Sequence, residues 1–412
     1  MKKLALLMFV LLAACTRSPA PCVNAAPAPT LPDVATPEAS APAAPTASET
    51  RAGVAQCPTP AQLDTDLTAA SQAAVISLSG LNPLTCPEVT MTETWAGGKL
   101  IFSDSPETPT DRGKLYEDGT LPATSGSDYN RVFAYHVNGR SAKSRFTVLL
   151  KNTSASAGTL TVQRRGTAGP TTSFLYAGKL AFERWLNAAA ATPVNVAAGA
   201  TVRLDTTFDV TDVNTGNLLH GIWDYSFGQT HQVTICILAT NDAPLTVCPT
   251  LAVLARDTHK RGTFPYADKV YDTASGVIID TAAGVQQFPV AGGTATDAFA
   301  VGVDVTDGTA MTNAGNYGVL YRMHIATSAS DGQNIGFLIN PRAGQWGGAA
   351  WTLAGLLPGG KFLIPAASGS TGDNAKGAVE GRYNLSATPA PWAQFMPTGG
   401  SSFPVRFVAV PH

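Results

Sequence analysis

Short stretches in which apolar and polar residues alternate make up most of the chain after residue 56. They are rich in Val, Thr, Phe and Tyr, and they are separated by Gly, Asn, Asp and Pro. This pattern is typical of β-strands joined by turns. Only residues 60–78 and 177–191 have a helical pattern. The sequence therefore predicts an all-β fold with one or two short helices.

Two segments of the chain share one plan. Residues 130–154 and 316–343 each contain a strand with a central histidine, a polar connection, and an apolar strand that ends near an asparagine. Alternation places His136 opposite Phe133, and it places His324 opposite Tyr321. Because two copies of one plan in a chain of this length suggest two similar halves, we expect two β-sandwich-like domains, residues 56–250 and 251–412.

The N-terminus has a different pattern. Lys2 and Lys3 precede an apolar run that is too short to span a bilayer, and small residues lead to Cys15. This is typical of a secretion signal, which we expect to cover residues 1–14. Residues 12–15, LAAC, also resemble the lipobox of bacterial lipoproteins, which implies cleavage before Cys15 and lipidation of its thiol. Thr16, where other lipoproteins have Asp, implies release to the outer membrane. Ordinary secretory cleavage, with Cys15 incidental, is the alternative.

Residues 16–55 are mostly Ala, Pro, Ser and Thr and contain no aromatic residue. Such a composition cannot bury enough apolar surface to offset the entropy of ordering. We therefore expect residues 15–55 to be the lipidated cysteine and a disordered Pro/Ala-rich linker, a tether that holds the folded part away from the membrane. The formal net charge is −2 and no basic stripe is present, so nucleic acid is not an expected partner.

The six cysteines suit an oxidising compartment. We expect one disulfide between Cys57 and Cys86 and a second between Cys236 and Cys248, which leaves Cys22 unpaired in the linker. Other connectivities stay open because spacing alone does not fix the pairing. Metal thiolates are the alternative, although the chain has no Cys-x-x-Cys pair.

Several segments, in the same order, resemble a family of secreted bacterial envelope proteins: LIFSDSPE (100–107), RVFAYHVNG (131–139), TLTVQRRGTAGPTTSFLYAGKLAFERWL (159–186), GNYGVLYRMHI (315–325) and FLINPRAGQWGGA (337–349). In other chains this region often accompanies a stalk domain named after the copper amine oxidase N-terminal domain. The resemblance covers residues 90–411 and implies no reaction. A second resemblance, to lipoprotein subunits of S-layer complexes, one of which is regarded as a copper-only superoxide dismutase, raises the question of a copper site.

Such a copper site needs about four imidazoles around one metal, usually with two from a His-x-His strand. This chain has no His-x-His, and its candidate ligands are His136, His220, His231, His259 and His324. A hairpin with its turn at residues 226–229 would place His220 and His231 on one face, but roughly 13 Å apart along the strand. Loops would therefore have to bring the rings together, with Arg256, Lys260 and Arg261 nearby to steer an anion. The alternative is that each histidine is an ordinary sheet-face or loop residue.

Other residues offer weaker chemistry. Asp209 with Asp212, and Asp304 with Asp307, offer oxygen ligands for calcium, and the same residues cap turns without any metal. The tryptophans at 346, 351 and 392 would form a platform for a sugar or a partner if they were exposed together, and they are core residues otherwise. The chain has no phosphate-binding loop, nucleophile elbow or His-Glu-x-x-His segment.

Three functions follow from these patterns. The first is an outer-membrane-anchored lipoprotein of the cell envelope, periplasmic or surface-exposed, that acts as a structural or binding subunit of an S-layer-type assembly. If the chain is instead an enzyme, we expect a copper-dependent superoxide dismutase that protects the envelope. The third is a glycan-binding module. The expected partners are the membrane, through the lipid, and other envelope or S-layer proteins, with glycan as a further candidate; copper, and after it calcium, are the candidate cofactors.

Overall fold

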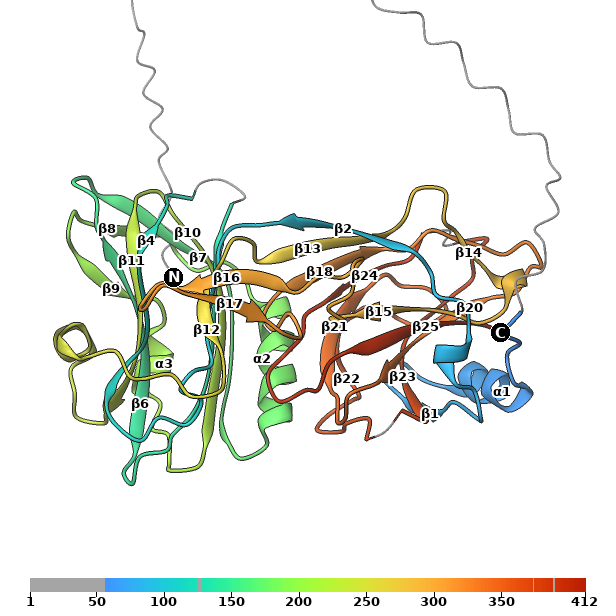
Figure 1. Cartoon of the computed structure of the whole chain (residues 1–412), viewed down its shortest axis with the longest axis horizontal. Coiled ribbons are helices and arrows are strands. Elements are labelled where there is room, and N and C mark those ends of the chain that lie inside the picture. The colour runs from blue at the N-terminus through green and yellow to red at the C-terminus, as the bar shows by residue number, and fades with distance from the viewer. Residues whose placement is uncertain (1–55, 125–127, 373, 388–389) are drawn as a thin grey trace, which may run out of the picture. The chain divides into compact units, whose positions relative to one another are not determined.

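The computed structural model describes residues 56–124, 128–372, 374–387 and 390–412. The expected signal segment, the lipidation of Cys15, the linker and Cys22 lie outside these residues. Strands hold 45% of the chain and helices 12%, so the all-β prediction is confirmed. Figure 1 shows the strands gathered into sheets, with short helices beside them.

The first sandwich is formed by two sheets of unequal width (Figure 1). The eight-stranded sheet has the order β17-β16-β12-β3-β5-β10-β7-β8, formed by β3 (Leu100–Ser103), β5 (Asn130–Val137), β7 (Gly158–Thr171), β8 (Val194–Val196), β10 (Leu218–Phe227), β12 (Arg261–Phe264), β16 (Ala300–Asp304) and β17 (Thr309–Asn313). The four-stranded sheet has the order β4-β11-β6-β9, formed by β4 (Gly113–Leu121), β6 (Ser144–Asn152), β9 (Thr201–Arg203) and β11 (His231–Ala239). Ile101, Val132 and Trp223 of the wider sheet pack with Val148 and Ile235 of the narrower one.

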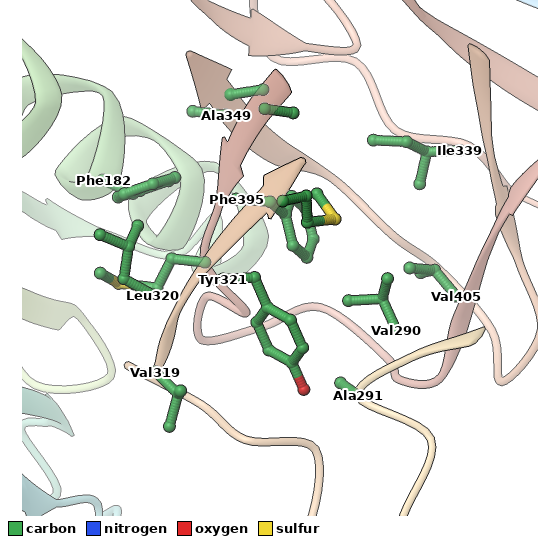
Figure 2. Packing of buried hydrophobic residues seen from close by; sticks show 14 of the residues in the cluster. Phe182, Val290, Ala291, Val319, Leu320, Tyr321, Ile339, Ala349, Phe395 and Val405 are labelled. Atoms are coloured by element: carbon green, nitrogen blue, oxygen red, sulfur yellow. The ribbon is translucent and has the colours of Figure 1, made fainter. Parts of the chain in front are cut away.

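The second sandwich pairs a six-stranded and a five-stranded sheet. The six-stranded sheet has the order β2-β13-β18-β24-β21-β22, formed by β2 (Met91–Ala96), β13 (Asp268–Thr273), β18 (Leu320–His324), β21 (Gly348–Thr352), β22 (Gly360–Ile364) and β24 (Trp392–Phe395). The five-stranded sheet has the order β1-β23-β20-β25-β15, formed by β1 (Val75–Ser77), β15 (Gln286–Val290), β20 (Ile335–Pro341), β23 (Lys376–Tyr383) and β25 (Val405–Pro411). Figure 2 shows Tyr321 and Phe395 of one sheet near Val290, Ile339 and Val405 of the other, within one buried cluster.

Short elements complete the fold: β14 (Ile279–Asp280) paired with β19 (Thr327–Ser328), the helices α1 (Ala61–Ala69), α2 (Phe174–Asn187), α3 (Thr206–Val210) and α4 (Pro244–Val247), and the 3₁₀ helices η1 (Pro83–Thr85), η2 (Cys248–Thr250) and η3 (Thr281–Ala283). Helix α2 contacts β7 and β10 of the first sandwich and β21 and β22 of the second. It buries Ala181, Phe182 and Trp185 there, because these residues recur at helical spacing on one face.

One helix is shorter than its sequence pattern suggests. The expected helix over residues 60–78 ends at Ala69, and Val75–Ser77 form β1 instead. Val75 pairs with Ala378, so β1 adds to the edge of the five-stranded sheet through β23. The β-branched Val75 and Ile76 favour an extended backbone, and this tertiary pairing prevails over the local helical pattern.

Both segments of the repeated plan cross from one sheet of a sandwich to the other. β5 lies in the eight-stranded sheet and β6 in the four-stranded one, while β18 lies in the six-stranded sheet and β20 in the five-stranded one. The two sandwiches do not divide at residue 250, however. β1 and β2 join the second sandwich, and β12, β16 and β17 extend the first, so the expected boundary runs through three sheets.

A buried ion cluster joins the two sandwiches. The Arg131 guanidinium on β5 donates from Nε to Asp224 Oδ1 at 2.7 Å, and one of its terminal nitrogens lies 3.3 Å from Asp268 Oδ1 on β13. Its remaining donors reach the main-chain oxygens of Ala267 and Gly318. Removing the arginine would leave the buried Asp224 carboxylate without its paired cation and Asp268 with Arg322 alone, which is strongly unfavourable. The cluster therefore fixes the eight-stranded sheet against the six-stranded one.

Both expected disulfides are confirmed. Cys57 and Cys86 are bonded with their Cα atoms 5.3 Å apart, and Cys236 and Cys248 with theirs 5.9 Å apart. The second bond attaches the segment after β11 to the four-stranded sheet, where both of its cysteines are buried. The chain therefore leaves that sheet from a fixed point.

Candidate functional site

His136 and His220 lie on opposite faces of the eight-stranded sheet. The His136 ring is buried, with Nδ1 2.9 Å from the Pro106 carbonyl oxygen and Nε2 2.9 Å from Ser103 Oγ. A neutral ring that donates from Nδ1 accepts at Nε2, here from the Ser103 hydroxyl. His220 places Nδ1 2.8 Å from the Ala134 carbonyl oxygen, and its ring packs against Phe133. Burial lowers the pKa of both histidines to about 4, so both are neutral at pH 7.

His231 is not the hairpin partner of His220. β10 pairs with β5 and β7, whereas β11 pairs with β4 and β6, so the expected hairpin around residues 226–229 is wrong. The short connection after Phe227 instead crosses between the two sheets. His231 is buried there, with Nδ1 2.9 Å from the Gln229 carbonyl oxygen and Nε2 2.9 Å from the Tyr225 hydroxyl. Both ring nitrogens are therefore engaged.

The other two candidate histidines are exposed and paired with carboxylates. His259 lies 3.1 Å from Glu107 and 3.2 Å from Asp257. His324 Nδ1 lies 2.9 Å from Asp272 Oδ1 on the neighbouring strand β13. Within the described part of the chain, no group of three or more His, Cys, Asp or Glu side chains is arranged to hold a metal ion. The structure brings none of the five candidates together as a copper site.

Of the three basic residues expected to steer an anion, Lys260 is exposed and the two arginines hold a turn instead. Arg261 is buried and donates from Nε to Asp304 Oδ2 at 2.9 Å, and Arg256 lies 2.9 Å from Asp307 Oδ2. The same two carboxylates accept from the main-chain N–H groups of Thr306 and Thr309. These contacts favour the turn-capping interpretation of this aspartate pair over calcium binding.

The other aspartate pair, Asp209 and Asp212, has its two side chains in separate contacts. Asp212 pairs with Arg145 at 2.7 Å. Asp209 is buried in α3, where burial raises the pKa of its carboxyl to about 6. Asp209 also lies 3.5 Å from Arg203, so the two aspartates pair with different arginines and do not form one oxygen cluster.

The three tryptophans separate into one core residue and one surface pair. Trp346 is fully buried and stacks on Phe395, with ring centroids 6.0 Å apart. Trp351 and Trp392 are half-buried and meet edge to face with centroids 5.3 Å apart. The Lys361 ammonium lies 4.8 Å from the Trp351 ring and donates to the Leu186 carbonyl at the end of α2. The expected platform is thus reduced to two rings.

A different surface stands out on the wider sheet. One row of paired residues crosses it from Val132 through Ile101 and Thr263 to Val303. Val132 and Ile101 are fully buried beneath the four-stranded sheet, whereas Val303 is 40% exposed. The four-stranded sheet ends above β12, where the Tyr116 hydroxyl of its edge strand β4 lies 2.9 Å from Thr263 Oγ1. Among the residues that the structure describes, no sheet therefore covers β16 on this side.

We call the uncovered surface the open face, formed by Pro265, Tyr266, Val301, Val303 and Val305. The three valines are 61%, 40% and 39% exposed, and Tyr266 is 45% exposed. Monomeric proteins rarely expose contiguous apolar patches larger than a few hundred Å², and larger patches are typical of interaction sites. Four of the twelve exposed large hydrophobic residues among the described residues belong to the open face.

Two pockets line the open face and share Pro265 and Val301. The first has a volume of about 220 Å³ and is lined by Trp95, Pro265, Tyr266, Phe299, Ala300 and Val301. The second has a volume of about 370 Å³ and extends over Val303 and Val305 toward Asp118 and Thr120 of β4. One end of the combined groove is therefore apolar and aromatic, and the other end borders a strand edge.

Sequence reasoning missed this surface because its pattern is misleading. Val301, Val303 and Val305 alternate with Ala300, Gly302 and Asp304. Such alternation normally places the valines in the core. Here Ala300, Gly302 and Asp304 are buried and the valines face outward. No local signal in these residues shows that the four-stranded sheet ends before β16.

Comparison of the chain with protein-family models finds no match, and comparison with curated proteins finds no significant relative. Among the described residues, no helix is both long and apolar enough to cross a membrane. Inferences about function therefore depend on the surfaces and contacts of this chain.

Proposed function

We propose that this chain is a non-catalytic binding subunit of the cell envelope that docks another envelope protein through the open face. A lipid on Cys15 and the linker after it would hold the subunit at the outer membrane, and the partner would belong to an S-layer-type assembly. The single observation that carries the proposal is the group of exposed valines, Val301, Val303 and Val305, beside the Trp95–Tyr266 pocket. Apolar residues at the centre of an interface, with an aromatic pocket for an anchoring side chain, are typical of protein–protein recognition.

The arrangement of the histidines supports a binding role over the dismutase alternative. Three of the five rings are buried on strands of the first sandwich, where each makes at least one hydrogen bond to a main-chain carbonyl. The other two are exposed and pair with separate carboxylates. None of these environments presents a shared metal site to solvent.

A second candidate function, glycan binding, is favoured by the Trp351–Trp392 pair. Both rings are half-buried, so each has an exposed part on the outer face of the six-stranded sheet. Sugar rings stack on such aromatic faces through their C–H groups. Retention of the protein on envelope polysaccharide, and loss of retention in Trp392→Ala, would favour this function.

Site-specific photo-crosslinking in the native envelope tests the main proposal. A photoreactive residue at position 301 should give one recurring adduct with an envelope protein. The matched control is position 194, because Val194 is 48% exposed on β8, the opposite edge strand of the same sheet. Adducts at position 301 alone are the expected result. Equal adducts at both positions, or none at either, would contradict a docking role for the open face.

A further inference from the structure

We infer that the partner binds as an extended strand that adds to the free edge of β4 and covers the open face. This inference rests on the proposed function, and it specifies how the partner is recognised. It starts from the unequal width of the two sheets in the first sandwich. The narrower sheet stops at β4, and the next strand position beyond β4 lies over β16.

The chain itself fills the first part of this strand position. Residues 252–254 run parallel to the start of β4, where the Lys114 N–H donates to the Ala252 oxygen at 2.9 Å and the Leu254 N–H donates to the Lys114 oxygen at 2.8 Å. Leu254 also packs against the core of the first sandwich. An extended backbone is therefore already accommodated beside β4, and the chain turns away after Leu254.

Within the described part of the chain, no strand fills the second part of the position. Among the described residues, none from Leu115 to Leu121 makes a main-chain hydrogen bond to a strand other than β11. The Leu115 oxygen accepts from the Arg261 guanidinium, and the Thr120 N–H donates to the Asp118 carboxylate. Leu115, Tyr116, Asp118 and Leu121 are buried, whereas Glu117 is half-buried and Gly119 is exposed. Glu117 and Gly119 are therefore the positions at which strand addition would use this edge.

The spacing of sheets explains why the valines are exposed. Neighbouring strands lie about 4.8 Å apart and packed sheets about 10 Å apart. Because β4 lies over β12, a strand added beyond β4 lies over β16, the next strand of the wider sheet. Its inward side chains would then contact Val301, Val303 and Val305. The added strand would pack on the valines of β16, as Val148 and Ile235 of the four-stranded sheet pack with Ile101 and Val132.

This geometry defines the chemistry of the partner segment. Every second residue faces the open face and must be apolar, and the residues between them face solvent. One inward position takes a large apolar side chain, which enters the pocket beside Trp95 and Tyr266. Proline is excluded wherever the segment must donate to β4. A helix would present apolar residues three and four apart and would leave the β4 edge unpaired, so the two modes of binding differ in pattern.

The test selects a peptide display library on the purified protein, with counter-selection on Val303→Asp. The expected result is a set of peptides whose apolar residues recur at every second position. Each should bind at least about tenfold more weakly to Val301→Asp and Val303→Asp, because an unpaired charge in the interface costs well over 1.4 kcal/mol. Val194→Asp should bind normally. The thermal transition of each variant shows that it is folded.

Two further measurements separate strand addition from other modes. Bound peptide should slow amide hydrogen exchange in residues 117–121, and N-methylation of the peptide should abolish binding at alternate positions only. Peptides that depend on Val303 but neither protect β4 nor show this alternation would overturn strand addition and leave the docking role intact. Failure to select any peptide that distinguishes the native protein from Val303→Asp would count against both.

Discussion

The two ends of one row in the eight-stranded sheet differ sharply. Val132 and Ile101 are fully buried, whereas Val303, two strands beyond Ile101 in the same row, is 40% exposed. The residues are chemically alike and the sheet is continuous, so the difference arises from the covering sheet alone. In a β-sandwich whose sheets differ in width, the inner face of the wider sheet therefore continues beyond the edge of the narrower sheet. This continuation is where a partner can bind without any change in the subunit.

Alanine substitutions at two residues of this row test the comparison most strongly. One residue lies beneath the four-stranded sheet and the other lies outside it. Ile101→Ala removes fully buried methyl groups and should lower the free energy of unfolding by about 2–5 kcal/mol. Val303→Ala should change it by less than about 0.5 kcal/mol, because the side chain is not enclosed. Urea denaturation measures both values. A loss of more than about 2 kcal/mol in Val303→Ala would mean that the open face is packed after all.

The buried glutamate Glu380 gives a second test, on a polar group. Glu380 is 2% exposed on β23, and burial raises the pKa of its carboxyl to about 8. The folded state therefore keeps a proton that the unfolded state releases above about pH 4.5. Its contribution to stability is complete below that pH and is lost as the pH rises toward about 8.

Glu380→Gln removes this pH dependence because the amide does not ionise. Each unit of pKa shift corresponds to about 1.4 kcal/mol, so the variant should gain a few kcal/mol relative to the native protein between pH 5 and pH 9. Denaturation at both pH values gives the difference. Glu183→Gln, at a half-buried position of α2, is the matched control for the substitution itself. A difference for Glu380→Gln that does not change with pH would show that its carboxyl is ionised in the fold.

The second disulfide provides a smaller test, on the segment that partly fills the strand position beside β4. Cys236 and Cys248 are 12 residues apart, and closing a loop of about 15 residues contributes about 3 kcal/mol in the chain-entropy model. The double variant Cys236→Ala/Cys248→Ala should lose about 2–3 kcal/mol. Amide exchange at Leu254, which donates to Lys114, should also become faster. Unchanged exchange at Leu254 would mean that its pairing with β4 is independent of the disulfide.

The sequence was informative where local pattern determines structure. Alternation correctly placed Phe133 and Tyr135 on one face of β5, and cysteine spacing suggested both disulfides. The sequence patterns did not predict which strands pair with one another. The connection after Phe227 looks like a hairpin turn, but it joins two sheets, because β10 pairs with β5 and β7 while β11 pairs with β4 and β6.

The candidate site shows the same limit. The histidines were singled out by residue type, yet their roles depend on contacts with distant segments, such as Ser103 for His136 and Asp272 for His324. The open face was missed because the outward direction of Val303 depends on where the four-stranded sheet ends. No local pattern in residues 300–305 contains that information.

Cysteine accessibility in intact envelopes tests the docking role most directly. Val303→Cys and Val194→Cys, each in a Cys22→Ser background, are labelled with a maleimide first in the envelope and then after purification. We predict that position 303 is labelled at least about tenfold more slowly in the envelope than in the purified protein, while position 194 is labelled equally in both. Equal labelling of position 303 in both states would contradict the proposal that the open face is covered by a partner.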